Sequence, residues 1–328
     1  MSDSRNGRKP APRELSPLFH THIIVDWSAR SKPSPAKRTK DAIWWAVARI
    51  DGGSVSVHRP GYARTRHTVL RRLARLIAGE LDSGRRVMVG FDFPFGYPEG
   101  VAAHLTGKAC ALTLWDWLAA RVKDQPDNTN KRYDVAAEIN AAYPGCGPCW
   151  GRPGKWPYPT IPVKESERTE RGRHPPERRI ADRCAKGSKT VWQLAYAGSV
   201  GSQVLLGLPA LKHLMEARSI AGRAAVWPFQ TGLRTPEAPA VIAEVYPSLL
   251  RTQIGERRRE REILDCAQVR VNAEAFARLD ADGGLAPLFD GASWLTPVQR
   301  GVIETEEAWI LGVGHEEALK GALPTGRP

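Results

Sequence analysis

Three short apolar runs open the chain and show the periodicity of β-strands. They are His22 to Asp26, Ala42 to Ile50 and Ser54 to His58, and their β-branched and aromatic residues favour extended structure. An Asp-Gly-Gly turn at 51–53 joins the second run to the third, and glycine accepts the positive φ that a tight hairpin turn requires. The pattern therefore predicts three strands, of which the second and third are antiparallel neighbours.

Later segments alternate between helical and strand periodicity. Apolar residues recur at helical spacing from Arg66 to Leu81, whereas Val87 to Phe93 is a nearly continuous apolar run followed by Pro94, as expected of a buried central strand. The second half predicts a helix at Gly201 to Ala217, a strand at Val241 to Val245 and a helix at Glu260 to Leu279. The order βββαβαβα predicts an α/β fold with the mixed five-stranded sheet of ribonuclease H-like proteins.

A long segment rich in Pro, Gly and Trp interrupts this order. We expect residues 1–18 to form a flexible tail, residues 19–98 and 190–315 to form the core, and residues 99–189 to form an inserted subdomain or lid,. The tail is polar and lacks the apolar run of a secretory signal. A core of this size fits a chain of 328 residues with 42% hydrophobic content,.

Acidic residues follow two predicted strands and open the last helix. Asp26 ends the first strand, and Asp92 lies near the end of the fourth, its neighbour in the proposed sheet. Ligands of open α/β sheets bind beyond the carboxyl ends of the strands, and Asp265 in the last helix can reach the same edge. Carboxylates this close repel one another unless a hard cation neutralises them, so Mg²⁺ or Mn²⁺ is the expected cofactor. We therefore predict Asp26, Asp92 and Asp265 as metal ligands and catalytic residues.

Glu244 ends the fifth predicted strand and is a candidate fourth catalytic acid, either as a ligand or in support of the other three. Any one of the four acids could instead be a helix cap, a turn former or a solvated residue, but their joint placement favours a site. Asp92 is the most informative of them, because an ionisable group inside an apolar run is costly to bury without a partner or a metal.

Three sequence blocks resemble those of an uncharacterised bacterial family described as predicted ribonuclease H-like nucleases. The blocks are Val25-Asp26-Trp27-Ser28, Gly90-Phe91-Asp92-Phe93-Pro94-Phe95-Gly96 and Glu244-Val245-Tyr246-Pro247. In that family an Asp on the first strand, an Asp-x-Pro block and a Glu-x-x-Pro block occur in the same order, and the resemblance implies nuclease activity. Paired acids are common at the last helix of the family, whereas this chain has Asp265 followed by Cys266.

Small residues precede the helix predicted at Gly201. In Gly198-Ser199-Val200-Gly201-Ser202 the backbone N–H groups can cradle a phosphate at the helix N-terminus, although Gln203 follows where a Walker A loop continues with lysine,. Ser28, Lys189, Ser199 and Ser202 are the predicted substrate contacts. Tight packing at the start of the helix explains the glycines equally well.

Five cysteines among 328 residues do not make a disulfide framework, and a reducing, cytoplasmic setting is expected. Cys146 and Cys149, with His174 and Cys184 downstream, have the residue types of a structural zinc site,. A single Cys-x-x-Cys pair is a weak signal for Zn²⁺, so we favour packing of these cysteines beneath the tryptophans.

The chain is basic, with 48 Lys and Arg against 35 Asp and Glu and a formal charge of +13. This balance favours nucleic acid or a nucleotide as partner, although an arginine-rich surface without such a partner is the alternative. The basic runs 168–183 and 257–259 are interspersed with glutamates, which predicts solvated, salt-bridged faces. No apolar stretch reaches the length needed to cross a bilayer, so no membrane partner is expected.

Together these features favour a metal-dependent nuclease or phosphodiesterase. A nucleotide-binding phosphotransferase or ATPase on the same fold is the first alternative, with the segment 198–202 and Ser28 holding phosphates and Asp26 holding magnesium. A nucleic-acid-binding protein without catalysis is the second.

Overall fold

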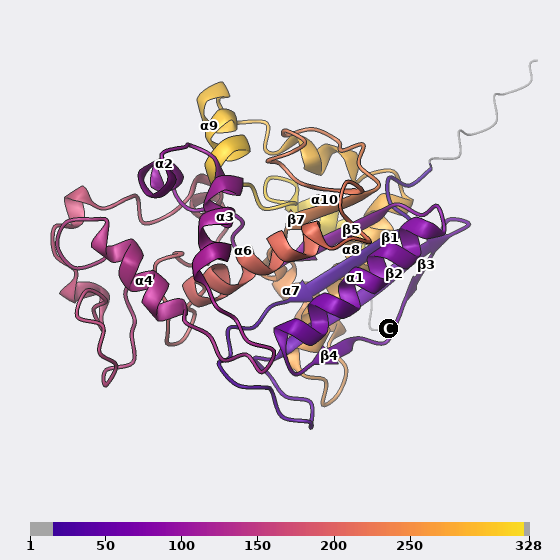
Figure 1. The fold of residues 1–328 in the computed structure, drawn as a ribbon. Helices are drawn as coiled ribbons and strands as arrows, with labels where there is room; N and C mark the ends of the chain where they lie inside the picture. The colour runs from indigo at the N-terminus through magenta and orange to yellow at the C-terminus, as the bar shows by residue number, and fades with distance from the viewer. Residues whose placement is uncertain (1–15, 325–328) are drawn as a thin grey trace, which may run out of the picture.

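A mixed sheet of seven strands runs through the centre of the molecule in a computed structural model that describes residues 16–324 (Figure 1). The strands are β1 (Thr21–Asp26), β2 (Ile43–Asp51), β3 (Ser54–Val57), β4 (Gly61–Ala63), β5 (Val87–Phe91), β6 (Ala224–Val226) and β7 (Ala240–Glu244). Their order is β3-β2-β1-β5-β7-β6, with β4 paired to β2. β2 is antiparallel to its three neighbours, whereas β1, β5, β7 and β6 are parallel to one another. The predicted α/β class is confirmed, and the sheet has two more strands, β4 and β6, than the five expected.

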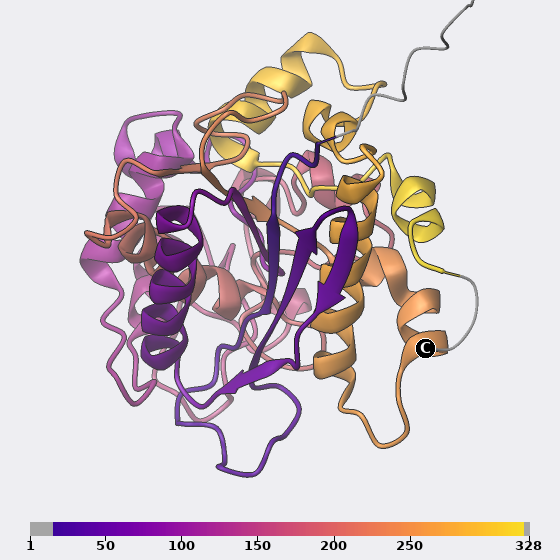
Figure 2. The same ribbon diagram turned by 90° about the vertical axis from the view of Figure 1, so that its right-hand side faces the viewer.

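Helices cover both faces of this sheet. They are α1 (Arg66–Asp82), α2 (Val101–Thr106), α3 (Ala111–Arg121), α4 (Arg132–Ala141), α5 (Ile180–Cys184), α6 (Gly201–Glu216), α7 (Arg251–Arg257), α8 (Leu264–Ala281), α9 (Pro297–Val302) and α10 (Glu316–Gly321), with short 3₁₀ turns and a π-helical turn at Ile303–Glu307 between them. Figure 2 shows α1 on one side of the strands and α8 on the other. The helices predicted from periodicity at Arg66, Gly201 and Glu260 correspond to α1, α6 and α8, and α8 begins at Leu264 rather than Glu260.

Each central strand contributes to two hydrophobic layers, because successive residues of a strand point to opposite faces. Ile23 and Val25 of β1 pack in the layer formed with α1, α3 and α6. Ile24, between them, packs in the layer formed with α8. Burial on both faces explains why these strands read as continuous apolar runs in the sequence.

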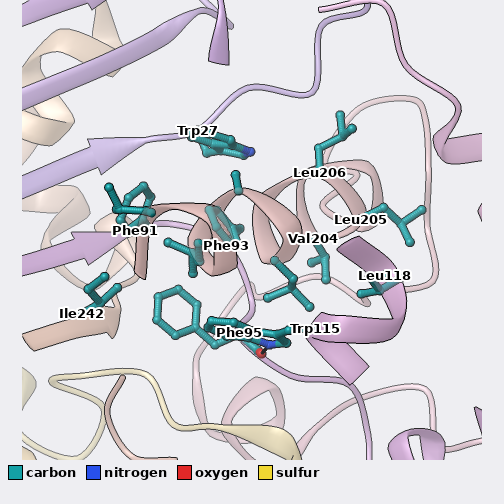
Figure 3. Packing of buried hydrophobic residues seen from close by; sticks show 14 of the residues in the cluster. Trp27, Phe91, Phe93, Phe95, Trp115, Leu118, Val204, Leu205, Leu206 and Ile242 are labelled. Atoms are coloured by element: carbon teal, nitrogen blue, oxygen red, sulfur yellow. Dashed lines mark hydrogen bonds between the residues drawn. The ribbon is translucent and has the colours of Figure 1, made fainter. Parts of the chain in front are cut away.

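A row of aromatic rings connects the end of β5 to the inserted segment. The ring centroids of Phe91, Phe93 and Phe95 follow one another at 5.7 Å, and Trp115 of α3 lies 5.9 Å beyond Phe95 (Figure 3). The indole N–H of Trp115 donates to the carbonyl of Phe95 at 2.8 Å. Gly207 of α6 allows the helix to approach, since a Cβ there would stand 2.4 Å from the Phe93 ring. Part of the insertion, including Trp115, therefore packs into the hydrophobic core.

The start of the described chain is attached at the opposite end of the sheet. The backbone N–H groups of Leu18 and Phe19 donate to the carboxylate of Asp280 in α8, at 2.7 and 2.8 Å. Of the tail predicted at residues 1–18, residues 1–15 lie outside the described part of the chain. Within residues 16–324, no helix combines the length and the apolar character needed to cross a bilayer.

Close packing around β5 leads to a stability prediction. A Cβ added at Gly90 would stand 2.6 Å from Cγ1 of Val245 and 2.8 Å from Cδ1 of Ile24. We expect Gly90→Ala to lower the free energy of unfolding by about 1–3 kcal/mol through overpacking, measured by urea denaturation. Gly79→Ala is the matched control, because Gly79 is exposed in α1 with nothing within 4 Å of the added Cβ, and it should stabilise by about 1 kcal/mol. Equal effects of the two substitutions would contradict the packing described for β5.

Candidate active site

The carboxyl ends of β1 and β5 bring two aspartates together. Val25 pairs with Phe91 in the parallel register of these strands, and Asp26 and Asp92 are the next residues on each. The Asp92 Oδ1 atom accepts a hydrogen bond of 2.8 Å from the backbone N–H of Trp27, and the two carboxyl groups are hydrogen-bonded to each other. The strand register alone therefore places both predicted ligands at one point.

Burial and mutual repulsion change the protonation of this pair. Burial raises the pKa of Asp26 well above its usual range, and the charges of Asp92, Asp265 and Asp41 raise it further. Burial also raises the pKa of Asp92 to about 7, against the opposing effect of the Trp27 hydrogen bond. Both side chains remain half-buried. Without a cation, such a pair retains a proton near neutral pH.

Asp265 reaches the same place from the second residue of α8. Its Oδ2 atom accepts a hydrogen bond of 2.7 Å from the backbone N–H of Asp41, and burial raises the pKa of its carboxyl group. A carboxylate in the first turn also interacts favourably with the helix dipole. Asp41 adds a fourth carboxylate to this group. Asp41 lies in the loop before β2 and has a left-handed backbone with φ 57°. Because a loop has no apolar periodicity, nothing in the sequence marks this residue as part of a site.

These acids line an open pocket of about 520 Å³. The pocket is bounded on the acidic side by Asp26, Asp41, Asp92 and Asp265, and elsewhere by Ser28, Arg132, Tyr133, Ser199, Ser202 and Gln203, among others. A smaller cavity of about 190 Å³ adjoins it and shares Asp92, Ser199 and Gln203. A groove of about 530 Å³ between α1, α3 and α6 has an apolar and basic lining without clustered acids. The acidic pocket is therefore the candidate active site.

The four predicted substrate contacts all line this pocket or the adjoining cavity. Ser28 and Ser202 line the pocket, Ser199 lines both spaces, and Lys189 lines the smaller cavity. Ser28 donates to the carbonyl of Asp41 at 2.8 Å, and Ser202 donates to the carbonyl of Leu194 at 2.6 Å. Their hydroxyl groups are therefore oriented by the backbone.

The glycines before α6 have packing roles. A Cβ at Gly201 would stand 2.3 Å from the carbonyl oxygen of Val191, and Gly198 has a left-handed backbone with φ 77°. The backbone N–H groups of Ser199 and Gly201 donate to the carbonyls of Tyr196 and Gln193. Close packing thus accounts for Gly201 and the left-handed backbone for Gly198, and two of the N–H groups of the block have partners within the chain.

Glu244 does not join the aspartates. Both of its carboxylate oxygens are bound to Arg179, at 2.8 and 2.6 Å, and one also accepts from the backbone N–H of Phe95 at 2.9 Å. Arg179 is fully buried and also pairs with Asp182 at 2.8 Å. Glu244 lines only the smaller cavity. The structure therefore gives it the role of a buried ion-pair partner rather than that of a fourth ligand.

Arg132 and Tyr133 are pocket residues that the sequence analysis missed. Arg132 is the first residue of α4 and has only 9% of its surface exposed. Its guanidinium group lies 4.9 Å from the centroid of the Tyr133 ring. A lone Lys-Arg-Tyr sequence within a charged insertion carries no signal, because only the tertiary fold brings α4 to the pocket.

The residues considered for zinc do not assemble. The Cys146 thiol bonds to the carbonyl of Thr160, Nε2 of His174 to the carbonyl of Pro144, and Cys184 is exposed beside Trp294. Cys149 is buried in the hydrophobic core. Among residues 16–324, no group of three or more His, Cys, Asp or Glu has the geometry of a metal centre as it stands. Metal binding at the aspartates would therefore require their side chains to rearrange.

The two basic runs form salt bridges, but the solvated faces expected for them are found only in part, since Arg168 and Arg257 are buried. Arg168 pairs with Glu177, Arg171 with Glu165 and Arg257 with Glu274. These arginines are therefore already engaged within the chain.

In comparisons with protein-family models, curated proteins and solved structures, nothing matched this chain.

The role of Glu244 can be tested by its effect on stability. We expect Glu244→Ala to lower the free energy of unfolding by about 3–5 kcal/mol, because it removes one partner of the buried Arg179. Glu138→Ala is the matched control, since the Glu138 pair with Arg121 is largely exposed and should contribute less than about 1 kcal/mol. Urea denaturation measures both. A small loss for Glu244→Ala that depends on added Mg²⁺ would instead support a ligand role.

The raised pKa values predict how stability depends on pH. The Asp26 and Asp92 pair stabilises the metal-free fold most below the ordinary aspartate pKa, and this stability is lost as the pH rises through the folded-state pKa, about 7 for Asp92,. Asp26→Asn should therefore raise the Tm of the metal-free protein by a few degrees at pH 8 and have little effect at pH 5. Added Mg²⁺ should raise the Tm of the wild type but not of the Asp26→Asn, Asp92→Asn double variant. Scanning calorimetry at both pH values makes the measurement, in chelator for the metal-free protein and without chelator for the Mg²⁺ comparison. A destabilised Asp26→Asn variant at pH 8 in chelator would contradict the prediction.

Proposed function

We propose that this chain is a metal-dependent phosphodiesterase that cleaves nucleic acid and has a ribonuclease H-like fold. The observation that carries the proposal is the acidic pocket, which Asp26, Asp92 and Asp265 line together with Arg132. Carboxylates suit a hard cation, and a guanidinium group suits a phosphate. The net charge of +13 favours the same class of substrate,.

The strand arrangement supports the fold named in this proposal. Three antiparallel strands, β1 to β3, are followed by β5 and β7, which add in parallel on the other side of β1. Helix α8 follows the last strand and carries Asp265 across the sheet to the same edge. Asp26 and Asp92 match the first-strand Asp and the Asp-x-Pro block of the family that the sequence resembles, and Asp265 stands where that family often has paired acids.

The donor set fits Mg²⁺ or Mn²⁺. Asp26, Asp92 and Asp265 supply only carboxylate oxygens. Burial raises the pKa of each, and repulsion from neighbouring carboxylates adds to the shift,. When bound there, such a cation lowers the pKa of water and neutralises charge on a phosphodiester. The backbone N–H groups of Trp27 and Asp41 hold Asp92 and Asp265 in orientation. Ser28, Ser199 and Ser202 remain candidates for contacts to the substrate.

A nucleotide-binding phosphotransferase or ATPase is the alternative on the same fold. Its main support in the sequence is the block 198–202 at the start of α6. The structure explains the glycines of this block by packing and backbone conformation, and we therefore rank the phosphotransferase second. Lys189 beside Gly198 is the feature that still favours it, since this lysine lines the cavity next to Asp92.

Cleavage assays test the proposed activity. We expect the purified protein to cleave at least one of single-stranded, duplex, branched or RNA–DNA hybrid substrates when Mg²⁺ or Mn²⁺ is present. Asp26→Asn and Asp92→Asn should each lower the rate by at least about a hundredfold, since even the outer partners of a metal site typically contribute ten- to hundredfold. Asp290→Asn is the control, because Asp290 is exposed and does not line the pocket.

Three outcomes separate the possible functions. Cleavage that survives both substitutions would place the activity outside this pocket and refute the proposal. Absence of cleavage together with a Tm raised by nucleotide would favour the phosphotransferase. Salt-sensitive binding of nucleic acid without cleavage or metal dependence would favour the non-catalytic protein.

A further inference from the structure

One buried arginine differs from the others in its partners. The described chain buries six arginines, which are Arg66, Arg132, Arg168, Arg179, Arg257 and Arg270. Five of them form ion pairs with a carboxylate at 3.0 Å or less. No carboxylate of residues 16–324 forms an ion pair with Arg132. A buried cation is costly unless it is paired, so the exception needs an explanation.

Neutral oxygens hold the Arg132 side chain in place. Its Nε atom donates to Oγ of Ser202 at 2.9 Å, and its Nη1 atom donates to Oγ of Ser31 and Oδ1 of Asn130, both at 2.8 Å. These bonds come from the loop after β1, the segment before α4 and the start of α6. They fix the guanidinium group without neutralising its charge, and burial lowers the pKa of Arg132.

One acid of the insertion, Asp124, acts on the charge of Arg132 but is already engaged. Asp124 accepts two hydrogen bonds from Arg66, at 2.6 and 2.7 Å. The positive charge of Arg66 therefore offsets the effect of the negative charge of Asp124 on Arg132. Arg132 lines the pocket that contains the three aspartates, and an anion entering this pocket would supply the missing counter-charge.

Aromatic side chains continue outward from Arg132. Tyr133 lines the pocket, and Trp156 packs on it with ring centroids 4.6 Å apart. Trp156 is 41% exposed and Tyr196, beside the pocket residue Ala195, is 55% exposed. Exposed aromatic rings beside a cation are the features that bind unpaired bases by stacking. A duplex keeps its bases stacked inside, so this surface suits a single strand.

We propose that Arg132 binds a non-reacting phosphate of a single-stranded nucleic acid, next to the phosphate that lies at the aspartates. The inference rests on the proposed function for the placement of the reacting phosphate. Arginine suits the role because a charge-assisted hydrogen bond to a phosphate oxygen is stronger than a neutral one. Ser202, Ser31 and Asn130 already hold Nε and Nη1, which leaves Nη2 to face the phosphate. Arg132 would thereby set the register of the strand relative to Asp26 and Asp92.

Binding to chemically modified strands tests this role without relying on catalysis. In the Asp26→Asn, Asp92→Asn background, short fluorescent single strands would be compared by anisotropy, each with one phosphate replaced by an uncharged methylphosphonate. We expect replacement at one position to weaken binding about ten- to hundredfold, the effect of one charge-assisted contact. With Arg132→Gln added, binding should already be weaker by a similar factor and insensitive to replacement at that position.

Two further variants control for charge and folding. Arg75→Gln removes the same charge from an exposed position on α1 that does not line the pocket, and it should leave the sensitive position unchanged. Arg132→Lys retains the charge and should restore part of the affinity. If Arg132→Gln fails to fold, the methylphosphonate series on the parent still decides, since uniform effects at every position would overturn the proposal.

The outcomes distinguish failure of this inference from failure of the proposed function. Coupling between Arg132 and one phosphate in a protein that cleaves nothing would leave the phosphate site standing and refute the nuclease. Cleavage of single strands without such coupling would refute the phosphate site alone. Arg132-dependent binding of a nucleoside diphosphate, with no affinity for the strands, would identify a nucleotide as the source of the phosphate and overturn the single-strand assignment.

Discussion

The parallel pairing of β1 with β5 is the constraint on which the site depends. It sets Val25 opposite Phe91, so that the next residues, Asp26 and Asp92, are adjacent at the ends of two central strands. Burial raises the pKa of both carboxyl groups, and the charge of Asp92 raises that of Asp26 further, so the pair opposes the fold at neutral pH,. The arrangement persists because both faces of these strands are buried under helices, with α1 and α6 on one side and α8 on the other. The hydrophobic layers thus stabilise a pair of side chains that alone would be unfavourable.

The insertion supplies the opposite charge. It is attached through Trp115, whose indole N–H binds the carbonyl of Phe95 just after β5. The same segment carries Arg132 to the pocket, where residues from the core and from α6 hold its guanidinium group. The core therefore provides carboxylates suited to a cation, and the insertion provides a cation suited to an anion. A phosphate ester with a bound metal is the kind of ligand that matches both.

The apolar periodicity predicted the longer strands and helices, because it reflects which face of each element is buried. The strands at His22, Ala42 and Val87 and the helices at Arg66 and Gly201 all follow from their apolar patterns. Strands β4 and β6 are only three residues long, too short for any pattern to be recognised. Asp26 and Asp92 could be predicted because each closes an apolar strand. Arg132 lies at the start of a helix and Asp41 lies in a loop, and no apolar pattern marks either position.

Glu244 shows why position alone does not decide a role. Like Asp26 it closes a parallel central strand, and the sequence treats the two alike. Arg179, which is 65 residues away in the chain, binds both oxygens of Glu244. Within residues 16–324 no Lys, Arg or His forms an ion pair with Asp26, and the charged groups that act on it are other carboxyl groups. The residue that contacts each acid in the folded protein therefore distinguishes the structural acid, Glu244, from the candidate catalytic acid, Asp26.

Charge acts in this protein on two length scales. The net charge of +13 attracts polyanions from a distance, but salt screens such attraction beyond about 8 Å at physiological ionic strength. Several arginines of the basic runs are held by glutamates, so they offer little directed contact. Arg132 is buried beside the pocket, and its hydrogen-bond partners within residues 16–324 are neutral oxygens of Ser202, Ser31 and Asn130. A contact made by this side chain acts at short distance, where screening is weak. Affinity for a polyanion should therefore follow the salt concentration, whereas the phosphate contact proposed for Arg132 should depend on it less.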